Sequence, residues 1–362
     1  MSLFSPSLLD RMRRSPAWAD GRFKNRIETK LEVRPSWDTT RRFLFDGDLR
    51  RPQGPLPSVA VDRAVLTGPV HDGVRVTWLG HSTSLVEVAG HRVLLDPVWS
   101  ERASPTDLVG PKRFQPVPIA IDAVPMPDFV LVSHDHYDHL DGEAIMSLAR
   151  RGARFVTTLG VGARLERWGV DPSRVTQLDW WQEHKAAPGL TVRAMPARHF
   201  SGRSIDDRNK TLWASWSIEA GGQRVFFGGD GGMDADCFTE IGERAGPFDL
   251  TMLEVGAFDE SWASIHLGPQ NAVKAQTLLK GKLLLPVHWG TFDLALHAWD
   301  QPVEELLVAA KREQIALALP RLGESVIPGD RVPTGAWWRA AQEARVSAAW
   351  GEAQTAPAAA RK

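Results

Sequence analysis

The sequence contains very little cysteine: Cys237 is the only one among 362 residues. One cysteine excludes an intrachain disulfide, which is typical of proteins that stay in a reducing compartment. No segment approaches the roughly 18 consecutive apolar residues that a transmembrane helix requires. The first residues also lack the basic region and apolar stretch of a secretory signal peptide. We therefore expect a cytoplasmic protein that has at most peripheral contact with a membrane.

A strong excess of charge is also absent, because 43 Lys and Arg nearly balance 44 Asp and Glu. The resulting net charge of −1 argues against a nucleic-acid partner. Only residues 1–51 are basic, with twelve Lys and Arg against seven Asp and Glu, a balance of +5. Such a segment could meet an anionic membrane, although an ordinary solvated surface explains it equally well. The sequence is also compatible with a homodimer.

The pattern along the chain predicts three segments. Residues 1–71 are rich in Arg, Pro and Trp and are expected to wrap a core as an N-terminal extension. Residues 72–330 form the expected core domain, and residues 331–362 a C-terminal helix with a disordered, low-complexity tail. Within the central segment, short β-favouring runs alternate with helical ones in two successive halves, which indicates an α/β sandwich. The expected strands are 74–79, 84–88, 92–95, 129–132, 155–157, 190–194, 213–218, 225–227, 250–254 and 283–287, and the expected helices are 143–151, 162–168, 269–280 and 303–314.

Metal-binding side chains are most concentrated in one short segment directly after the expected strand 129–132. It contains His134, His136, Asp138 and His139. Imidazole nitrogens and carboxylate oxygens suit Zn²⁺ and related divalent ions. A loop that turns sharply here can aim the first two histidines to one side and the last two residues to the other. Such an arrangement serves two ions that lie a few ångström apart.

Three further residues follow expected strands and can complete two metal sites. His199 follows strand 190–194, Asp230 follows 225–227, and His288 follows 283–287. Any one of them alone would more often be an ordinary core or surface residue. All seven in this order and context are not expected by chance.

The order His-x-His-x-Asp-His, then His, Asp and His, resembles the metallo-β-lactamase superfamily over about residues 72–330. This resemblance implies a four-layer αβ/βα sandwich with two divalent metal ions in a cleft at one sheet edge. Zinc fits the ligand types best, with manganese or iron as alternatives. The resemblance further implies one ion held by His134, His136 and His199, a second held by Asp138, His139 and His288, and a bridging role for Asp230.

Five segments resemble one branch of that superfamily more closely. They are GRFKN at 21–25, WLGHST at 78–83, LLDPVWS at 94–100, Tyr137, and HWGTF at 288–292. Together they resemble the N-acylphosphatidylethanolamine-hydrolysing phospholipases D and their bacterial relatives. Asp135 departs from the mammalian lipase, which has an amide there, but this position holds no metal. The resemblance implies a phosphodiesterase that acts on N-acylphosphatidylethanolamine or related glycerophospholipids.

The expected chemistry assigns roles to four side chains. The carboxylates of Asp138 and Asp230 can orient a metal-activated water and accept its proton. Tyr137, the only tyrosine, can donate to a phosphoryl oxygen because a phenol stays protonated up to a pKa of about 10. His266 precedes the expected helix 269–280, whose positive end suits an anionic substrate, and it is a candidate for catalysis. The resemblance implies substrate contacts for Tyr137 and His266.

Other readings remain open from the sequence alone. The same metal site could serve a lactonase or another ester hydrolase, or a β-lactamase in the narrow sense, since the superfamily does not choose the substrate. A noncatalytic metal- or lipid-binding module is a further alternative. His81 could support a metal ligand or pack in the core. The pairs Trp180–Trp181 and Trp337–Trp338 could anchor the protein at a membrane or fill its core.

Overall fold

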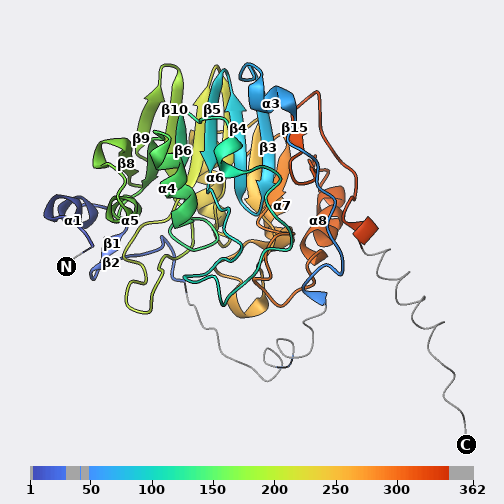
Figure 1. The fold of residues 1–362 in the computed structure, drawn as a ribbon. Coiled ribbons are helices and arrows are strands. Elements are labelled where there is room, and N and C mark those ends of the chain that lie inside the picture. The colour runs from blue at the N-terminus through green and yellow to red at the C-terminus, as the bar shows by residue number, and fades with distance from the viewer. Residues whose placement is uncertain (1–2, 30–40, 42–48, 342–362) are drawn as a thin grey trace, which may run out of the picture.

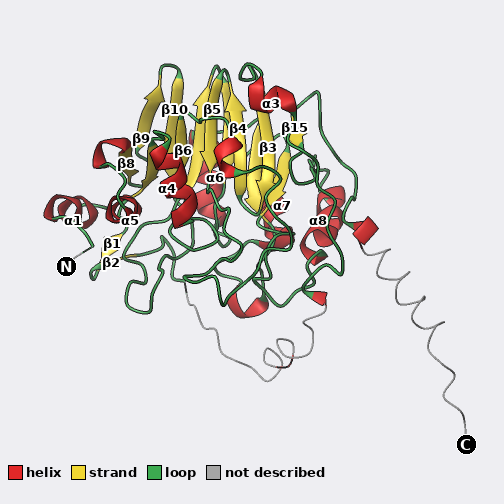
Figure 2. Ribbon diagram, in the orientation of Figure 1, coloured by secondary structure: helices red, strands yellow, loops and turns green. Residues whose placement is uncertain are grey.

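Two β-sheets stack face to face in the computed structural model, which describes residues 3–29, 41 and 49–341 (Figures 1 and 2). The seven-stranded sheet has the order β15 (Ser325–Val326), β3 (Val74–Gly80), β4 (Thr83–Val88), β5 (His91–Leu95), β6 (Phe129–Leu131), β7 (Phe155–Thr158) and β8 (Val175–Leu178). The six-stranded sheet has the order β14 (Leu284–Val287), β13 (Leu250–Glu254), β12 (Gln223–Phe227), β11 (Ser215–Ala220), β10 (Leu190–Met195) and β9 (Glu183–Ala187).

Each sheet combines an antiparallel and a parallel half. Strands β3, β4 and β5 form an antiparallel meander, and β5 to β8 pair in parallel. In the other sheet β9 to β12 are antiparallel, whereas β12, β13 and β14 are parallel. Parallel neighbours need crossover connections, and the helices between the strands supply them. The long loops gather at one end of the two sheets, at the lower edge of Figure 1.

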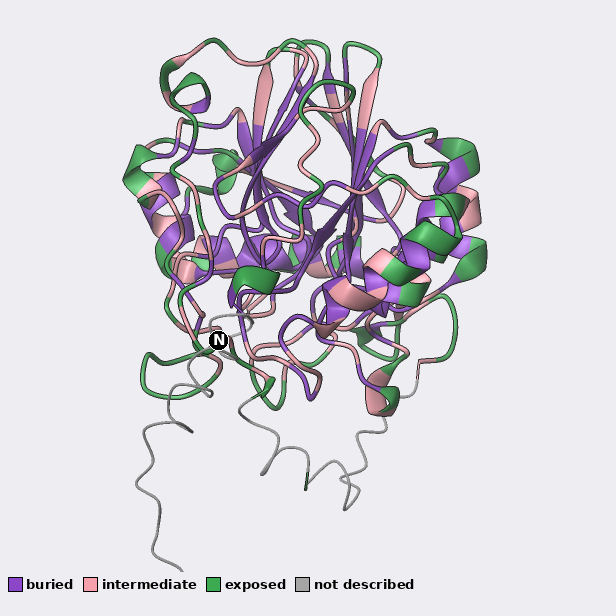
Figure 3. Cartoon of the chain, turned by 90° about the vertical axis from the view of Figure 1, so that its right-hand side faces the viewer, coloured by how far each residue is buried: buried purple, intermediate pink, exposed green. Residues whose placement is uncertain are grey.

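Helices cover the outer faces of both sheets, so the two sheets lie buried between them (Figure 3). Helices α4 (Gly142–Arg150) and α5 (Val161–Trp168) contact each other beside the seven-stranded sheet. Helices α6 (Ala235–Arg244), α7 (Gly268–Leu278) and α8 (Gln301–Arg312) cover the six-stranded sheet. The remaining elements are α1 (Pro6–Arg13), α3 (Arg63–Thr67), the strands β1 (Trp18–Ala19) and β2 (Arg22–Phe23), and the 3₁₀ turns η2 (Ile121–Ala123), η3 (Pro172–Arg174) and η4 (Glu260–Trp262). This arrangement is the predicted four-layer αβ/βα sandwich.

Local sequence explains where the helix beside the metal-binding segment begins. The Asp141 side chain accepts hydrogen bonds from the backbone N–H groups of Glu143 and Ala144, which caps α4. Between the sheets, residues such as Val86, Phe129 and Trp216 are fully buried in one apolar cluster. Each such side chain contributes roughly 1.5–3 kcal/mol by leaving water. The core therefore fixes the strand ends from which the site is built.

The expected strands and helices all occur, with ends that differ by one or two residues. The predicted strand 213–218 begins only at Ser215. Strands β1, β2, β8, β9 and β15 and helix α6 were not predicted. Strand β9 lies at the sheet edge and its sequence, EHKAA, is mostly polar, so it lacks the apolar alternation on which the prediction relied.

The N-terminal residues pack against the core. Leu8, Met12 and Phe23 form an apolar cluster with Leu159 and Trp213. No helix among the described residues is long and apolar enough to cross a membrane. Residues 30–40 and 42–48 of the basic segment lie outside the described residues, as does the tail from residue 352, and the boundaries at 71 and 330 stay predictions.

The paired tryptophans belong to the core more than to the surface. Trp338 is fully buried and donates from Nε1 to Glu304 Oε1 at 2.7 Å. Trp337 packs partly buried against the same cluster, as do Trp180 and Trp181. The packing alternative therefore accounts for both pairs.

Candidate metal centre

All seven predicted ligands lie at one edge of the two sheets, where strands end. His134, His136, Asp138 and His139 lie on the loop after β6, here named the histidine loop (residues 134–139), and the other three follow β10, β12 and β14: His199, Asp230 and His288. Five of these side chains are buried, and His136 and Asp138 are half-buried. Segments that are up to 150 residues apart in sequence thus meet in one place.

The first cluster contains three histidines and a carboxylate that could hold one ion. His136 Nδ1 lies 2.8 Å from His134 Nε2 and 3.3 Å from His199 Nε2. The Asp230 Oδ2 atom lies 3.8 Å from His199 Nε2 and 4.0 Å from His134 Nε2. Nitrogen and oxygen atoms therefore converge on one point from three different loops.

The second cluster contains Asp138, His139, His288 and also His81. Asp138 Oδ2 lies 3.0 Å from His81 Nε2, 3.2 Å from His288 Nε2 and 3.6 Å from His139 Nε2. Asp230 lies between the clusters, because Oδ1 is 3.1 Å from His139 Nε2 and Oδ2 is 3.1 Å from His288 Nε2. This is where a bridging ligand would have to be. His81 was expected either to support a metal ligand or to pack in the core, and in the structure it contacts the carboxylate of Asp138 directly.

Hydrogen bonds on the outer side of the histidines leave their inner nitrogens free for a cation. Ser133 Oγ donates to Asp96, so it can only accept from His134 Nδ1, at 2.9 Å. His199 Nδ1 likewise donates to the Ile265 carbonyl at 2.9 Å. Both Nε2 atoms therefore direct a lone pair toward His136. Lone pairs that face each other in a buried site are unfavourable unless a proton or a metal ion lies between them.

Several buried polar atoms at the centre have no hydrogen-bond partner within the described part of the chain. They are His81 Nδ1, His136 Nε2 and His288 Nδ1. Leaving such atoms unsatisfied costs about 1–3 kcal/mol each. A cluster of them is a sign of a bound group, and this donor set of imidazole and carboxylate fits divalent metal ions.

The two clusters differ in their electrostatics. Burial, reinforced by neighbouring histidines, keeps the pKa of His134 well below its ordinary value. Burial alone would also lower the pKa of His288, but Asp230 and Asp138 outweigh it and raise this pKa to about 10. The same carboxylates raise the pKa of His139 against the effect of burial. Without metal, His139 and His288 of the second cluster therefore hold protons where a cation would be held. His81 of the same cluster does not, because burial lowers its pKa to about 3.

Asp96, directly after β5, holds the histidine loop and the preceding Ser133 by hydrogen bonds. It accepts hydrogen bonds from Ser133 N at 2.7 Å, Ser133 Oγ at 2.6 Å and His139 Nδ1 at 2.7 Å. The last of these directs His139 Nε2 toward Asp230. Asp96 was not among the predicted site residues, although it lies in the segment 94–100 and follows a strand that ends at the same edge.

Glu254, the last residue of β13, joins two loops of the site. Its carboxylate accepts hydrogen bonds from Gly231 N at 2.7 Å, Leu267 N at 3.1 Å and His266 Nδ1 at 2.6 Å. Glu254 thus orients the predicted catalytic imidazole and fixes the backbone next to Asp230. Glu254 was not among the predicted site residues. Its position as the last residue of the predicted strand 250–254 was the signal that could have indicated it.

Asn25, from the N-terminal residues, holds the backbone of His199 by a pair of hydrogen bonds. Its amide accepts from His199 N at 3.0 Å and donates to His199 O at 2.8 Å. Asn25 Oδ1 also accepts from Trp213 Nε1 at 3.1 Å. The N-terminal segment therefore supports the site directly, which explains why the motif 21–25 accompanies the other site motifs.

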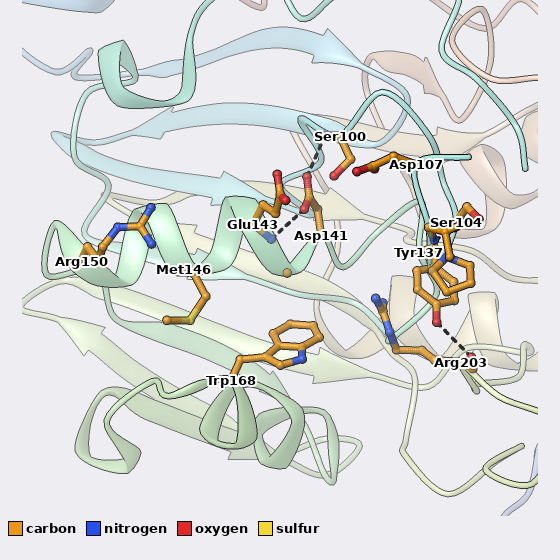
Figure 4. Close-up of a pocket in the computed structure, with 13 residues that line it drawn as sticks. Ser100, Ser104, Asp107, Tyr137, Asp141, Glu143, Met146, Arg150, Trp168 and Arg203 are labelled. Carbon is orange, nitrogen blue, oxygen red and sulfur yellow. Dashed lines mark hydrogen bonds between the residues drawn. The ribbon is translucent and has the colours of Figure 1, made fainter. Parts of the chain in front are cut away.

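Two cavities flank the histidine loop. One, of about 430 Å³, opens onto the clusters and is lined by His136, Asp138, Phe200, Arg208, Asp230, Ala257, Trp262, Ile265, His266, His288 and Leu294. His266 thus lies in this cavity, as its predicted role requires. Tyr137 lines the other cavity, of about 720 Å³, and its hydroxyl donates to the Arg203 carbonyl at 3.0 Å (Figure 4). Substrate contacts of both residues stay predictions.

Two stacked mixed sheets with His and Asp clusters at one edge define a metal-dependent hydrolase fold. The chain belongs to the metallo-β-lactamase superfamily: residues 91–289 match the family model described as "Beta-lactamase superfamily domain". The fold and the superfamily predicted from the ligand motif are thereby confirmed. The coarse function, a metal-dependent hydrolase, follows from this membership.

Relatives of the chain support the same assignment. An uncharacterised protein of Mycobacterium tuberculosis is 44% identical over 339 residues, which cover 90% of this chain and 88% of that protein. The N-acyl-phosphatidylethanolamine-hydrolyzing phospholipase D 1 of Caenorhabditis elegans is 36% identical over 263 residues, covering 66% of this chain and 72% of that protein. Among solved structures, the metallo hydrolase Igni18 of Ignicoccus hospitalis has a TM-score of 0.54 at 25% identity, and the match covers 70% of this chain and 97% of Igni18.

Proposed function

We propose that the protein is a phosphodiesterase of the phospholipase D type that hydrolyses N-acylphosphatidylethanolamine or related glycerophospholipids. The observation that carries this proposal is the 36% identity to the Caenorhabditis elegans enzyme of that name. The similarity spans about two thirds of the chain, more than the superfamily's ligand motif alone requires.

The metal centre is proposed to hold two divalent ions, with zinc the best match to the donor set. The proposed ligands are His134, His136 and His199 for one ion, Asp138, His139 and His288 for the other, and Asp230 for both. When bound, such a pair supplies a water-derived nucleophile and neutralises the non-bridging oxygens of a phosphodiester. The carboxylates of Asp138 and Asp230 orient the attacking water and accept its proton.

The cavity above the metal centre suits an amphiphilic substrate. Its walls include Phe200, Trp262, Ile265 and Leu294, which can receive the apolar part of a lipid. Arg208 lines the same cavity and can pair with a phosphate oxygen. A small sugar lactone would need a more polar lining than this one.

His266 is proposed to donate a proton to the substrate. Burial alone would lower the pKa of His266, but the Glu254 carboxylate at 2.6 Å outweighs it and raises this pKa above the ordinary value. A larger fraction of this imidazole is therefore protonated near neutral pH than of an ordinary histidine. From the cavity wall it can donate to a phosphoryl oxygen or to the oxygen of the departing headgroup.

Product analysis in ¹⁸O-labelled water tests the proposal. Metal-replete enzyme is given N-acylphosphatidylethanolamine, phosphatidylcholine and acyl-homoserine lactones, and the products are examined by mass spectrometry. We expect phosphatidic acid that carries one ¹⁸O on phosphorus, together with an N-acylethanolamine. Lactone opening at a far higher kcat/KM without phospholipid turnover would instead identify a lactonase on the same metal site.

A further inference from the structure

One arginine outside the predicted site holds both ends of the histidine loop. Arg203 Nη1 donates to the Asp135 carbonyl at 2.9 Å and to the Leu140 carbonyl at 2.7 Å. These carbonyls enclose residues 136–139, which include three of the proposed metal ligands. A single cationic nitrogen therefore fixes the distance between the loop's start and its end. Hydrogen bonds from a charged donor are about twice as strong as neutral ones.

Arg203 is itself fixed by the residue at the middle of the loop. Its guanidinium carbon lies 3.7 Å from the centre of the Tyr137 ring and 5.4 Å from the ring of Trp168. The Tyr137 hydroxyl donates to the Arg203 carbonyl at 3.0 Å, so the two residues hold each other (Figure 4). The side chain that binds the two ends of the loop is thus stacked on its middle.

The backbone around Arg203 is also held by charged side chains. Arg203 N donates to Asp207 Oδ1 at 2.9 Å, and Asp207 Oδ2 pairs with Arg164 Nη2 at 2.7 Å. Arg164 Nε in turn pairs at 2.6 Å with the carboxylate of Asp135, which also accepts from Gly202 N at 2.8 Å. This closed circuit gives Asp135 a role: it connects the histidine loop to the segment that carries Arg203.

We propose that Arg203 is a positioning residue for the metal centre, holding residues 136–139 in the conformation in which His136, Asp138 and His139 converge. The inference rests on the proposed metal site and concerns how that site is pre-formed. Arg203 touches neither cluster directly, and it lines the larger cavity on the opposite side of Tyr137. Its effect must therefore be transmitted through the backbone carbonyls of the loop.

Cobalt(II) affinity is the measurement that tests this role. The metal-free full-length protein is titrated with Co²⁺, and binding is followed by its visible absorption. Arg203→Ala should raise the Co²⁺ dissociation constant about 10- to 100-fold, the usual effect of removing a group that orients metal ligands. Should Arg203→Ala fail to fold, Arg203→Lys, which keeps the charge but loses the fork of donors, should show a smaller rise in the same assay.

A matched control separates positioning from general stability. Arg151 also donates to two backbone carbonyls, those of Ile121 at 2.8 Å and Val124 at 2.6 Å, at the far end of α4. Arg151→Ala should lower the Tm while leaving the Co²⁺ affinity unchanged. If it weakens Co²⁺ binding as much as Arg203→Ala does, the effect is one of stability and the proposal is overturned.

Chemical rescue provides a second readout. The cavity of about 720 Å³ beside Arg203 gives small solutes access to the space that Arg203→Ala leaves. Millimolar guanidinium chloride, far below denaturing concentrations, should restore part of the Co²⁺ affinity, whereas tetramethylammonium chloride, which has no N–H donor, should not. Wild-type affinity in Arg203→Ala refutes the positioning role. Absence of Co²⁺ binding in the wild type refutes the metal site itself, so the two failures are distinguishable.

Discussion

The two cavities beside the histidine loop differ in size and in how their polar groups are used. The larger one, of about 720 Å³, is lined by Asp141 and Arg203, whose polar atoms already bind the protein. Asp141 caps α4 and accepts from Trp99 N and Ser100 N, while Arg203 binds two carbonyls. The smaller one, of about 430 Å³, is lined by His136 and His288, each with a nitrogen that has no hydrogen-bond partner among the described residues. Unsatisfied buried donors and acceptors, more than volume, thus identify the reactive side of the loop.

The most severe test of this contrast exchanges one carboxylate for an amide on each side of the loop. Asp230→Asn removes the charge shared by both clusters, so we expect loss of metal and a fall in kcat/KM of about 1000-fold. Elemental analysis should give about two ions per chain in the wild type and fewer in the variant. Asp141→Asn, the matched change in the larger cavity, should keep the metal content, because the amide oxygen can still cap α4. Its Tm should fall, since the amide NH₂ cannot accept the hydrogen bonds from Trp99 N and Ser100 N. Equal metal loss in Asp230→Asn and Asp141→Asn would show that the two cavities do not differ in this way.

A second test concerns the imidazole that faces the smaller cavity without belonging to the proposed ligands. His266→Ala should keep both metal ions, since seven other side chains suffice to hold them. Its kcat/KM for phosphodiester substrate should fall about 10- to 1000-fold, as expected when a positioned acid–base group is removed. Steady-state kinetics together with metal analysis decide the question. A variant that loses metal would show that His266 is a ligand.

The sequence predicted the strands and the ligands because both have local signatures. Apolar runs predicted β6, β12 and β14, and the residues that follow these strands include metal-binding side chains. Since parallel strands end at a common edge, these side chains were expected to meet. The side chains that orient the predicted ligands also stand at strand ends, but their hydrogen-bond partners have no local signature. Asp96 and Glu254 act through hydrogen bonds to loops that are far away in sequence, which only the folded chain reveals.

Arg203 is a further residue whose role the sequence does not predict. Nothing in the segment 201–207 distinguishes it from other arginines of the chain, which carries 43 Lys and Arg. Its function depends on two carbonyl groups, and every residue has a carbonyl group. Tyr137 was conspicuous in the sequence for its position, whereas its partner could not be foreseen.

Tyr137 lies at the boundary between the two cavities, so its substitution sharpens the comparison. Tyr137→Phe should keep both metal ions and lower kcat/KM about 10-fold, the lower end of the range for a lost donor. The effect is expected to be modest because the hydroxyl already donates to Arg203 O at 3.0 Å. A loss of kcat/KM near 1000-fold that appears entirely in kcat would instead show that the Tyr137 hydroxyl contacts the substrate. The larger cavity would then be part of the reactive site.

The difference in protonation between the two clusters predicts how metal binding depends on pH. His288, with a pKa of about 10, and His139, whose pKa is raised, bind protons at neutral pH when no metal is present. Metal must displace these protons, so Co²⁺ affinity should fall as the pH is lowered and rise toward pH 10, by up to about tenfold per pH unit for each proton displaced, or about 100-fold when both are displaced. The histidines of the first cluster have lowered pKa values and release none. Proton release, measured with an indicator dye, should therefore accompany only one of the two binding steps.

Cys237 provides the smallest expected effect and a check on the ligand set. Burial raises the pKa of this thiol to about 12, so it stays protonated and unreactive at neutral pH. It packs in the core at the start of α6, and its sulfur lies 3.5 Å from the Pro196 carbonyl. Cys237→Ala should change kcat/KM less than about twofold, because an inert buried cysteine behaves as a small apolar side chain. The native protein should resist iodoacetamide at pH 8 and react after unfolding. The Co²⁺ complex of the wild type should lack a sulfur-to-cobalt charge-transfer band. A band in the wild type that disappears in Cys237→Ala would show that a thiolate replaces one of the proposed nitrogen or oxygen ligands.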